Sequence, residues 1–69
     1  MPVMLMNPGD EAVIRRISGG SAIRQRLAEL GFISGASVQV LGSNAGCVIL
    51  LVKGCRIALG SGMARHILV

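Results

Sequence analysis

Aromatic side chains are almost absent from this sequence, in which Phe32 is the only aromatic residue among 69. Grooves that recognise proline-rich peptides are lined by aromatic rings, so this chain cannot form one. Single-stranded nucleic acid is usually held by stacking of its bases on aromatic side chains, and a single ring offers little for that purpose. The core must therefore be built from valine, isoleucine and leucine.

Charged residues are also scarce, at 14% of the chain, and most of them are basic, which gives a net charge of +4. A positive charge favours anionic partners, because Lys and Arg neutralise phosphates. The basic residues are scattered, however, and form no continuous run. We therefore expect no nucleic acid partner. The alternative hypothesis is that the chain is a small basic barrel that binds nucleic acid or an anionic surface.

No hydrophobic run is long enough to cross a membrane. The longest, Cys47 to Val52, is far shorter than the roughly 20 residues that span a bilayer, although the mean hydropathy is high at +0.71. The apolar stretch from Met1 to Met6 has no basic residue before it and ends in a turn sequence, unlike a secretory signal. We expect a cytoplasmic protein without direct membrane insertion.

Groups that perform catalysis or bind metal are few. His66 is the only histidine, and the carboxylates Asp10 and Glu11 lie beside a turn, where a solvated pair explains them. The candidate metal ligands His66, Cys47 and Cys55 have no paired spacing and fall short of a four-ligand structural site. We predict that the protein is not an enzyme and has neither a cofactor nor a metal site.

One convincing helix is predicted over residues 21–30. Ser21 is a suitable N-cap, and Ile23, Leu27 and Leu30 form one apolar stripe. A left-handed glycine at position 31 would end the helix and place Phe32 against Leu27.

Residues 47–52 and 55–59 are predicted to form a hairpin around a two-residue turn at Lys53-Gly54. This register pairs Leu50 with Ile57 and Val52 with Cys55 on one apolar face, which we assign to the core. Cys47 then lies on the opposite face, too far from Cys55 for a disulfide, and is expected to be the more reactive thiol.

The remaining segments predict a small barrel formed by a single domain, residues 1–69. Strands are expected at 11–17, around Val38 and Val40, and at 66–69, with a loop at 42–46 and one helical turn at 63–65. The fold is therefore mainly β with one short inserted helix.

The order of these segments resembles the FeoA family, small cytosolic accessory proteins of bacterial ferrous iron transport. The resemblance covers almost the whole chain and rests on several short motifs. They are Asn7-Pro8-Gly9, Gly19-Gly20, Arg26-Leu27 through Glu29-Leu30-Gly31-Phe32, Arg56-Ile57-Ala58-Leu59 and Ile67-x-Val69.

The resemblance implies an SH3-like β-barrel with a helix inserted after the first strand. It also implies a non-enzymatic role in which the protein docks on the cytosolic side of FeoB, a ferrous iron transporter. The same fold occurs as the C-terminal domain of DtxR-type iron-dependent repressors, so a metal-regulated interaction module is a further alternative.

Two groups of residues are candidates for binding a partner. Arg24 and Arg26 place positive charge on a helix whose N-terminal end favours negative charge, which suggests an acidic partner surface. Ile49 and Leu51 are expected to be exposed beside Arg56 on the outer face of the hairpin. FeoB or a second copy of the chain would occupy one of these surfaces.

Overall fold

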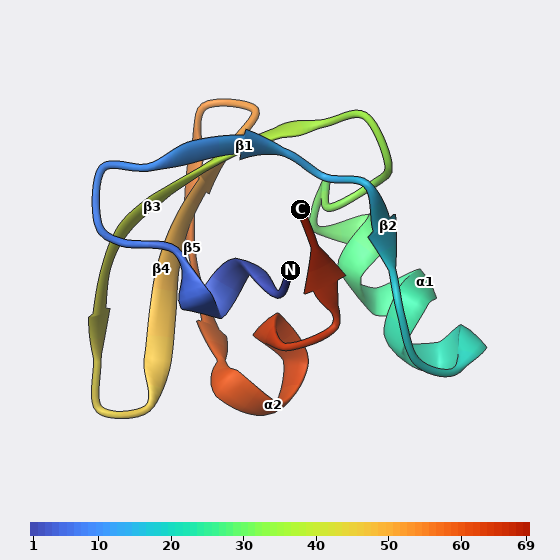
Figure 1. The fold of residues 1–69 in the computed structure, drawn as a ribbon. Coiled ribbons are helices and arrows are strands. Elements are labelled where there is room, and N and C mark those ends of the chain that lie inside the picture. Colours follow the sequence, from blue (N-terminus) through green and yellow to red (C-terminus); the bar gives the residue numbers. More distant parts are fainter.

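Strands predominate along the 69 residues of the computed structural model (Figure 1), which confirms the prediction of a mainly β fold. The elements in chain order are η1 (Val3–Leu5), β1 (Glu11–Val13), β2 (Arg16–Ile17), α1 (Ser21–Glu29), β3 (Ser37–Asn44), β4 (Cys47–Val52), β5 (Cys55–Gly60), α2 (Ser61–Ala64) and β6 (Ile67–Leu68). The helical turn expected at 63–65 is α2, which begins two residues earlier.

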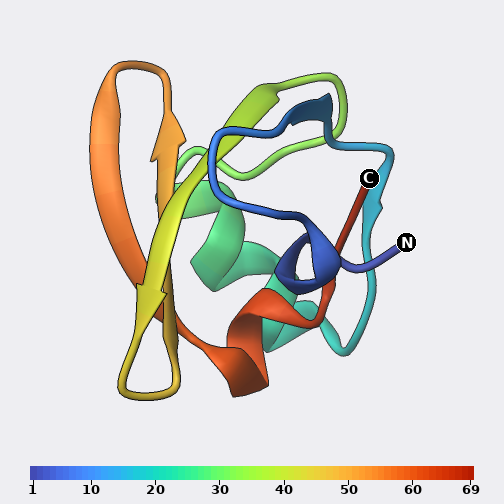
Figure 2. The same ribbon diagram turned by 60° about the vertical axis from the view of Figure 1, so that its left-hand side comes forward.

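The strands form two sheets that enclose one interior. β1, β3, β4 and β5 are antiparallel neighbours in the order β1-β3-β4-β5, and β2 pairs with β6 in a separate ribbon. Figure 2 shows the larger sheet curving around the interior, with the helices beside it. The two sheets are not joined into one, so the barrel is not closed.

The segment expected to be one strand at 11–17 is divided between the two sheets. β1 pairs with β3, whereas β2 pairs with β6. Between them Ile14 is buried, and its backbone N–H and C=O bond to Ala36 and Gly35 at 2.8 Å each. The chain therefore changes sheets at Ile14 without leaving these backbone groups unpaired.

The two ends of the chain meet beside the β2–β6 ribbon. The N-terminal amine of Met1 donates to the carbonyl oxygen of Val69 at 2.8 Å, and the N–H of Val69 donates to the carbonyl oxygen of Met1 at 2.8 Å. Pro2 and Leu68 form the adjoining bridge.

The β4–β5 hairpin has the predicted register. Leu50 pairs with Ile57 and Val52 with Cys55 around a turn in which Lys53 and Gly54 have φ values of 50° and 77°. Positive φ at both turn residues matches the right-handed twist of the flanking strands. The cross-strand pairing is therefore confirmed.

The loop expected at 42–46 is wrong, because β3 continues to Asn44. A second two-residue turn at Ala45 and Gly46, with φ values of 53° and 80°, connects β3 directly to β4. The register shifts between Val40 and Gly42, which leaves Leu41 in a β-bulge. Pairing with the strongly apolar β4 holds polar residues in a strand that their own propensities do not favour.

Helix α1 begins at Ser21 and is capped at its C-terminal end by Leu30, which agrees with the predicted range, but its N-cap is Gly20 and not Ser21. Gly31 has a φ of 101°, and the N–H groups of Gly31 and Phe32 donate to the carbonyl oxygens of Ala28 and Leu27 at 3.0 and 2.9 Å. These two bonds define a Schellman motif, so the predicted helix end is confirmed.

The core contains thirteen apolar side chains and includes the lone aromatic ring. Phe32 and Leu27 are completely buried, and η1 contributes Val3. Two expectations for β5 are corrected: Ile57 is half-buried and Cys55 is exposed. β5 lies at the edge of the sheet, so no further strand covers these side chains.

Leu50→Ala should lower the free energy of unfolding by about 2 to 5 kcal/mol, because it leaves a cavity at a fully buried site. Ile57→Ala should cost clearly less, since Ile57 is half-buried. Urea unfolding monitored by circular dichroism measures both losses. Equal losses in the two variants would contradict the assigned core.

Candidate functional site

The residues predicted to bind a partner lie on two separate surfaces. Leu51 and Arg56 are cross-strand partners, and Ile49 lies on the same outer face of the sheet. Arg24 and Arg26 are exposed on α1. The structure therefore brings the hairpin residues together and leaves the two arginines on a different element.

The outer face is less exposed at its centre than expected. Ile49 and Leu51 are half-buried, because β4 has neighbouring strands on both sides. The exposed aliphatic side chains nearby are Val13 on β1, 57% exposed, and Leu41 in the bulge, 40% exposed. We call Val13, Leu41, Ile49, Leu51 and Arg56 the outer patch.

Sequence reasoning missed two members of the outer patch. The position of Val13 follows from the two-residue alternation of a strand, since its neighbour Ala12 pairs with the buried Val38. Leu41 gives no such signal, because its exposure depends on a bulge that only the pairing with β4 reveals.

The two arginines differ in their relation to the ends of α1. Arg24 lies in the first half of a helix that has no acidic residue in its first turn, as predicted. Arg26 lies in the last turn, where positive charge is favourable, so the argument from the helix dipole does not apply to it. No side-chain hydrogen bond involves the side chain of a Lys or Arg, so both guanidinium groups are free to meet a partner.

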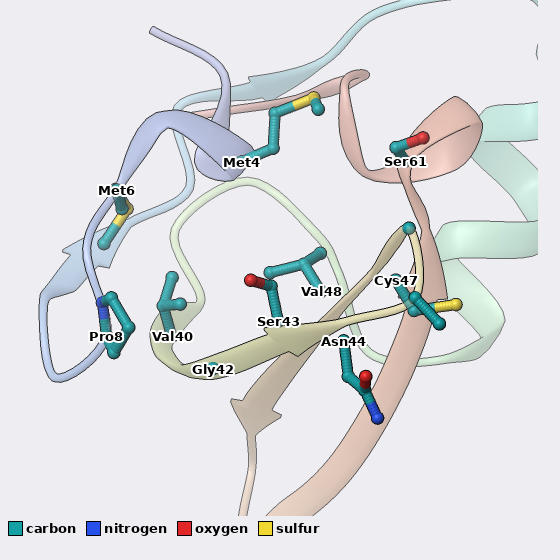
Figure 3. A pocket seen from close by; sticks show the side chains of 12 residues that line it. Met4, Met6, Pro8, Val40, Gly42, Ser43, Asn44, Cys47, Val48 and Ser61 are labelled. Carbon is teal, nitrogen blue, oxygen red and sulfur yellow. The ribbon is translucent and has the colours of Figure 1, made fainter.

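A pocket of about 490 Å³ opens between η1 and the β3–β4 hairpin, and the sequence analysis did not identify it. Figure 3 shows Met4, Met6 and Pro8 on one side of it and β3 and β4 residues on the other. The N–H of Ser61 donates to the carbonyl oxygen of Gly46 at 3.0 Å, which ties the hairpin tip to α2. The pocket is thus bounded by segments from both halves of the chain.

The floor of the pocket is formed by the least completely covered part of the core. Met6 and Val48 line it and are 8% and 7% exposed, the two highest values among the core residues. None of the lining residues is Asp, Glu, Lys, Arg or His. The pocket therefore suits an uncharged group better than a charged one.

The single histidine is half-buried and hydrogen-bonded. Its Nδ1 lies 3.0 Å from the hydroxyl oxygen of Ser18, and a Cβ at Gly19 would lie 3.0 Å from the same nitrogen. No group of three or more His, Cys, Asp or Glu could hold a metal ion. None of the helices has the length and apolar character needed to cross a membrane.

Comparison with known proteins gives a match over the full chain. The family model of the FeoA domain matches residues 1–69. A predicted Fe(2+) transport protein A of Methanocaldococcus jannaschii is 34% identical over 68 residues, which are 99% of this chain and 83% of that protein.

Solved structures share the fold. An iron uptake regulatory protein, FeoA, is 39% identical, with a TM-score of 0.87 over 96% of this chain and 88% of its own. The zinc complex of FeoA from Stenotrophomonas maltophilia, an SH3 domain protein, is 25% identical, with a TM-score of 0.86 over 100% and 88% of the two chains. The predicted SH3-like fold is confirmed.

The fold also occurs within a longer protein. IdeR of T. acidophilum is 28% identical, with a TM-score of 0.85, and this chain matches 32% of its length. The similarity to IdeR is therefore confined to one part of that protein's chain.

Cys55 should react with iodoacetamide faster than Cys47, which reverses the expectation from the sequence, because Cys55 is exposed and Cys47 is half-buried. Both thiols should be free, since the hairpin register places them on opposite faces. Mass spectrometry of the native protein over time gives the two rates, and Cys47→Ser provides the assignment. Faster labelling of Cys47, or an intrachain disulfide, would contradict this placement.

Proposed function

Because this chain belongs to the FeoA family, we propose that it is a non-enzymatic, cytoplasmic accessory protein of ferrous iron uptake that docks on the cytosolic side of the FeoB transporter. The observation that carries the proposal is the FeoA domain match, which extends over residues 1–69 and so includes every element of the fold. The similarity to the Fe(2+) transport protein of Methanocaldococcus jannaschii supports the same role.

The charge of the chain supports docking on a protein surface of opposite sign. Arg24 and Arg26 are exposed on one helix and have no hydrogen-bonded partner within the chain. An acidic surface on the transporter would complement these side chains and accelerate the encounter of the two proteins. The arginines are therefore proposed to guide the protein to FeoB.

The outer patch supplies apolar surface for the same complex. Val13 and Leu41 are exposed, and they extend the half-buried surface of Ile49 and Leu51 across the sheet. A protein interface typically has apolar side chains at its centre and polar or charged side chains at its rim. In the outer patch, Arg56 is the charged residue beside the apolar ones. The patch could also pair two copies of the chain, which the hairpin variants described below would reveal.

A resident metal does not account for the proposed role. The Stenotrophomonas maltophilia protein was solved with zinc. In this chain Cys47 and Cys55 lie on opposite faces of the hairpin, and His66 is engaged by Ser18. These side chains do not converge on one point, so they do not fit a shared metal ion. We propose that the protein acts through its surfaces.

Reversing the charge of both arginines, Arg24→Glu with Arg26→Glu, should weaken binding to full-length FeoB in nanodiscs by about tenfold. Ferrous iron uptake in a strain lacking the native gene should fall, and the melting temperature should remain nearly unchanged. Arg15→Glu with Arg16→Glu is the matched control, because it changes the net charge equally at exposed residues outside α1. Equal loss in both double variants would indicate a non-specific charge effect.

Ile49→Asp and Leu51→Asp should each weaken the complex with FeoB, because a carboxylate within the outer patch must be desolvated on docking. Binding through apolar surface should persist at raised ionic strength, whereas phosphate binding would weaken steeply. Size-exclusion chromatography with light scattering tests the second-copy alternative. Wild-type binding and uptake in both folded variants would remove the outer patch from the docking surface.

A further inference from the structure

The pocket beside η1 lies along a stretch of β3 that pairs with β4 on one side and with no strand on the other. The N–H of Gly9 donates to the carbonyl oxygen of Val40 at 2.7 Å, and the N–H of Val40 donates to that of Asp10 at 3.0 Å. Before Gly9 the chain turns away toward η1, as Figure 1 shows. β3 continues to Asn44 with β4 as its only neighbour, so residues 41–44 form an open sheet edge.

Ser43 presents both of its backbone groups at this open edge. Asn44 and Cys47 close the two-residue turn and therefore face each other as a hydrogen-bonded pair. Hydrogen bonding alternates along an antiparallel pair, so the N–H and C=O of Ser43 point away from β4. None of the turn, loop or side-chain hydrogen bonds involves Ser43.

The pocket lies beside these backbone groups, because Ser43 is one of its lining residues. Figure 3 shows Ser43 and Val48 on one side and Met4 and Met6 on the other. Its volume of about 490 Å³ lies within the range of small-ligand pockets and can hold a few side chains. An apolar floor thus lies beside an unpaired donor and acceptor.

We propose that this pocket binds an extended peptide segment of another protein, which adds to the open edge of β3 as a further strand. The backbone of the segment hydrogen-bonds to the N–H and C=O of Ser43, and one apolar side chain packs on Met6 and Val48. Strand addition of this kind obtains affinity from main-chain hydrogen bonds and specificity from pockets for alternate side chains.

The charge of the chain indicates what kind of protein supplies the segment. A second copy has the same net charge of +4, so pairing of two copies at this edge is opposed by like charge. An acidic protein is attracted instead. The pocket lining has no charged residue, so acidic residues of the segment flank the apolar one and remain in solvent. This inference goes beyond the proposed docking on FeoB, because it concerns Ser43 and the pocket beside it, whose lining includes no residue of the outer patch.

The other edge of the same sheet is a natural comparison. By the same alternation, the N–H of Ala58 on β5 points away from β4. No pocket lies beside it. Arg56 also places a charge on this edge, which is a common protection against strand addition.

Selection from a phage library of random octapeptides against the purified chain tests the proposal. Enriched sequences should be acidic overall and should carry apolar residues at alternate positions. A synthetic peptide of the consensus should bind with a Kd of micromolar order. In NMR spectra it should slow hydrogen exchange of the Ser43 amide, which a peptide bound elsewhere would not do.

Two pairs of variants locate the site. Ser43→Pro removes the outward N–H, and Met4→Asp places a charge in the pocket wall, so each should weaken peptide binding by about tenfold or more. Ala58→Pro is the control for Ser43→Pro, because it removes an outward N–H at the other edge of the sheet. Leu5→Asp is the control for Met4→Asp, because it places a charge on an exposed residue outside the pocket. Both should bind within about twofold of wild type.

Several results would overturn the proposal. They are failure of any octapeptide to enrich, loss of binding in Ala58→Pro but not in Met4→Asp, and unchanged exchange of the Ser43 amide in the complex. Concentration-dependent pairing of two copies through Ser43 without any peptide would also overturn it. If Ser43→Pro does not fold, the Met4→Asp and Leu5→Asp pair and the exchange measurement still decide the question.

Discussion

The pairing of β4 with strands on both sides is the interaction on which the rest of this structure depends. β3 and β5 are each joined to β4 along its whole length, and every second residue of β4 is buried. Two tight turns fix the registers and so decide which face of the sheet is apolar. The buried residues of β4 lie on the inner face of the sheet. This face is covered by α1, α2, η1 and the β2–β6 ribbon.

The same arrangement explains where the protein has surface to offer. With β4 in the centre, β5 becomes one edge of the sheet and the far half of β3 becomes another. The outer face stays uncovered by any helix, because all the helical segments contribute to the single buried cluster. A chain of this size has too few elements to cover both faces of a sheet.

Local chemistry made much of the fold predictable from the sequence. The Lys53-Gly54 turn was enough to give the register of the β4–β5 hairpin, and Gly31 was enough to give the end of α1. The split of residues 11–17 at Ile14 and the bulge at Leu41 were not predictable, because each depends on a partner strand distant in the sequence. The prediction that Cys55 is buried was wrong for a related reason. The register of the hairpin shows which face of the sheet Cys55 lies on, but only the strand order shows that β5 is an edge strand and leaves this side chain exposed.

The candidate site was predictable only in part. Exposure of Arg24, Arg26 and Arg56 followed from their charge. The pocket left no trace in the sequence, because Met4 and Met6 meet the β3–β4 hairpin only when η1 folds back across the sheet.

The paired hydrogen bonds between Met1 and Val69 bring residues from opposite ends of the chain to adjacent positions. A short peptide that joins Val69 to Met1 would circularise the chain with little rearrangement of the folded state. It would also lower the conformational entropy of the unfolded chain. New ends could then be opened at an exposed turn such as Ala45-Gly46. The order of strands along the chain is thus separable from their arrangement in space, and a circularly permuted form could retain the sheet that β4 organises.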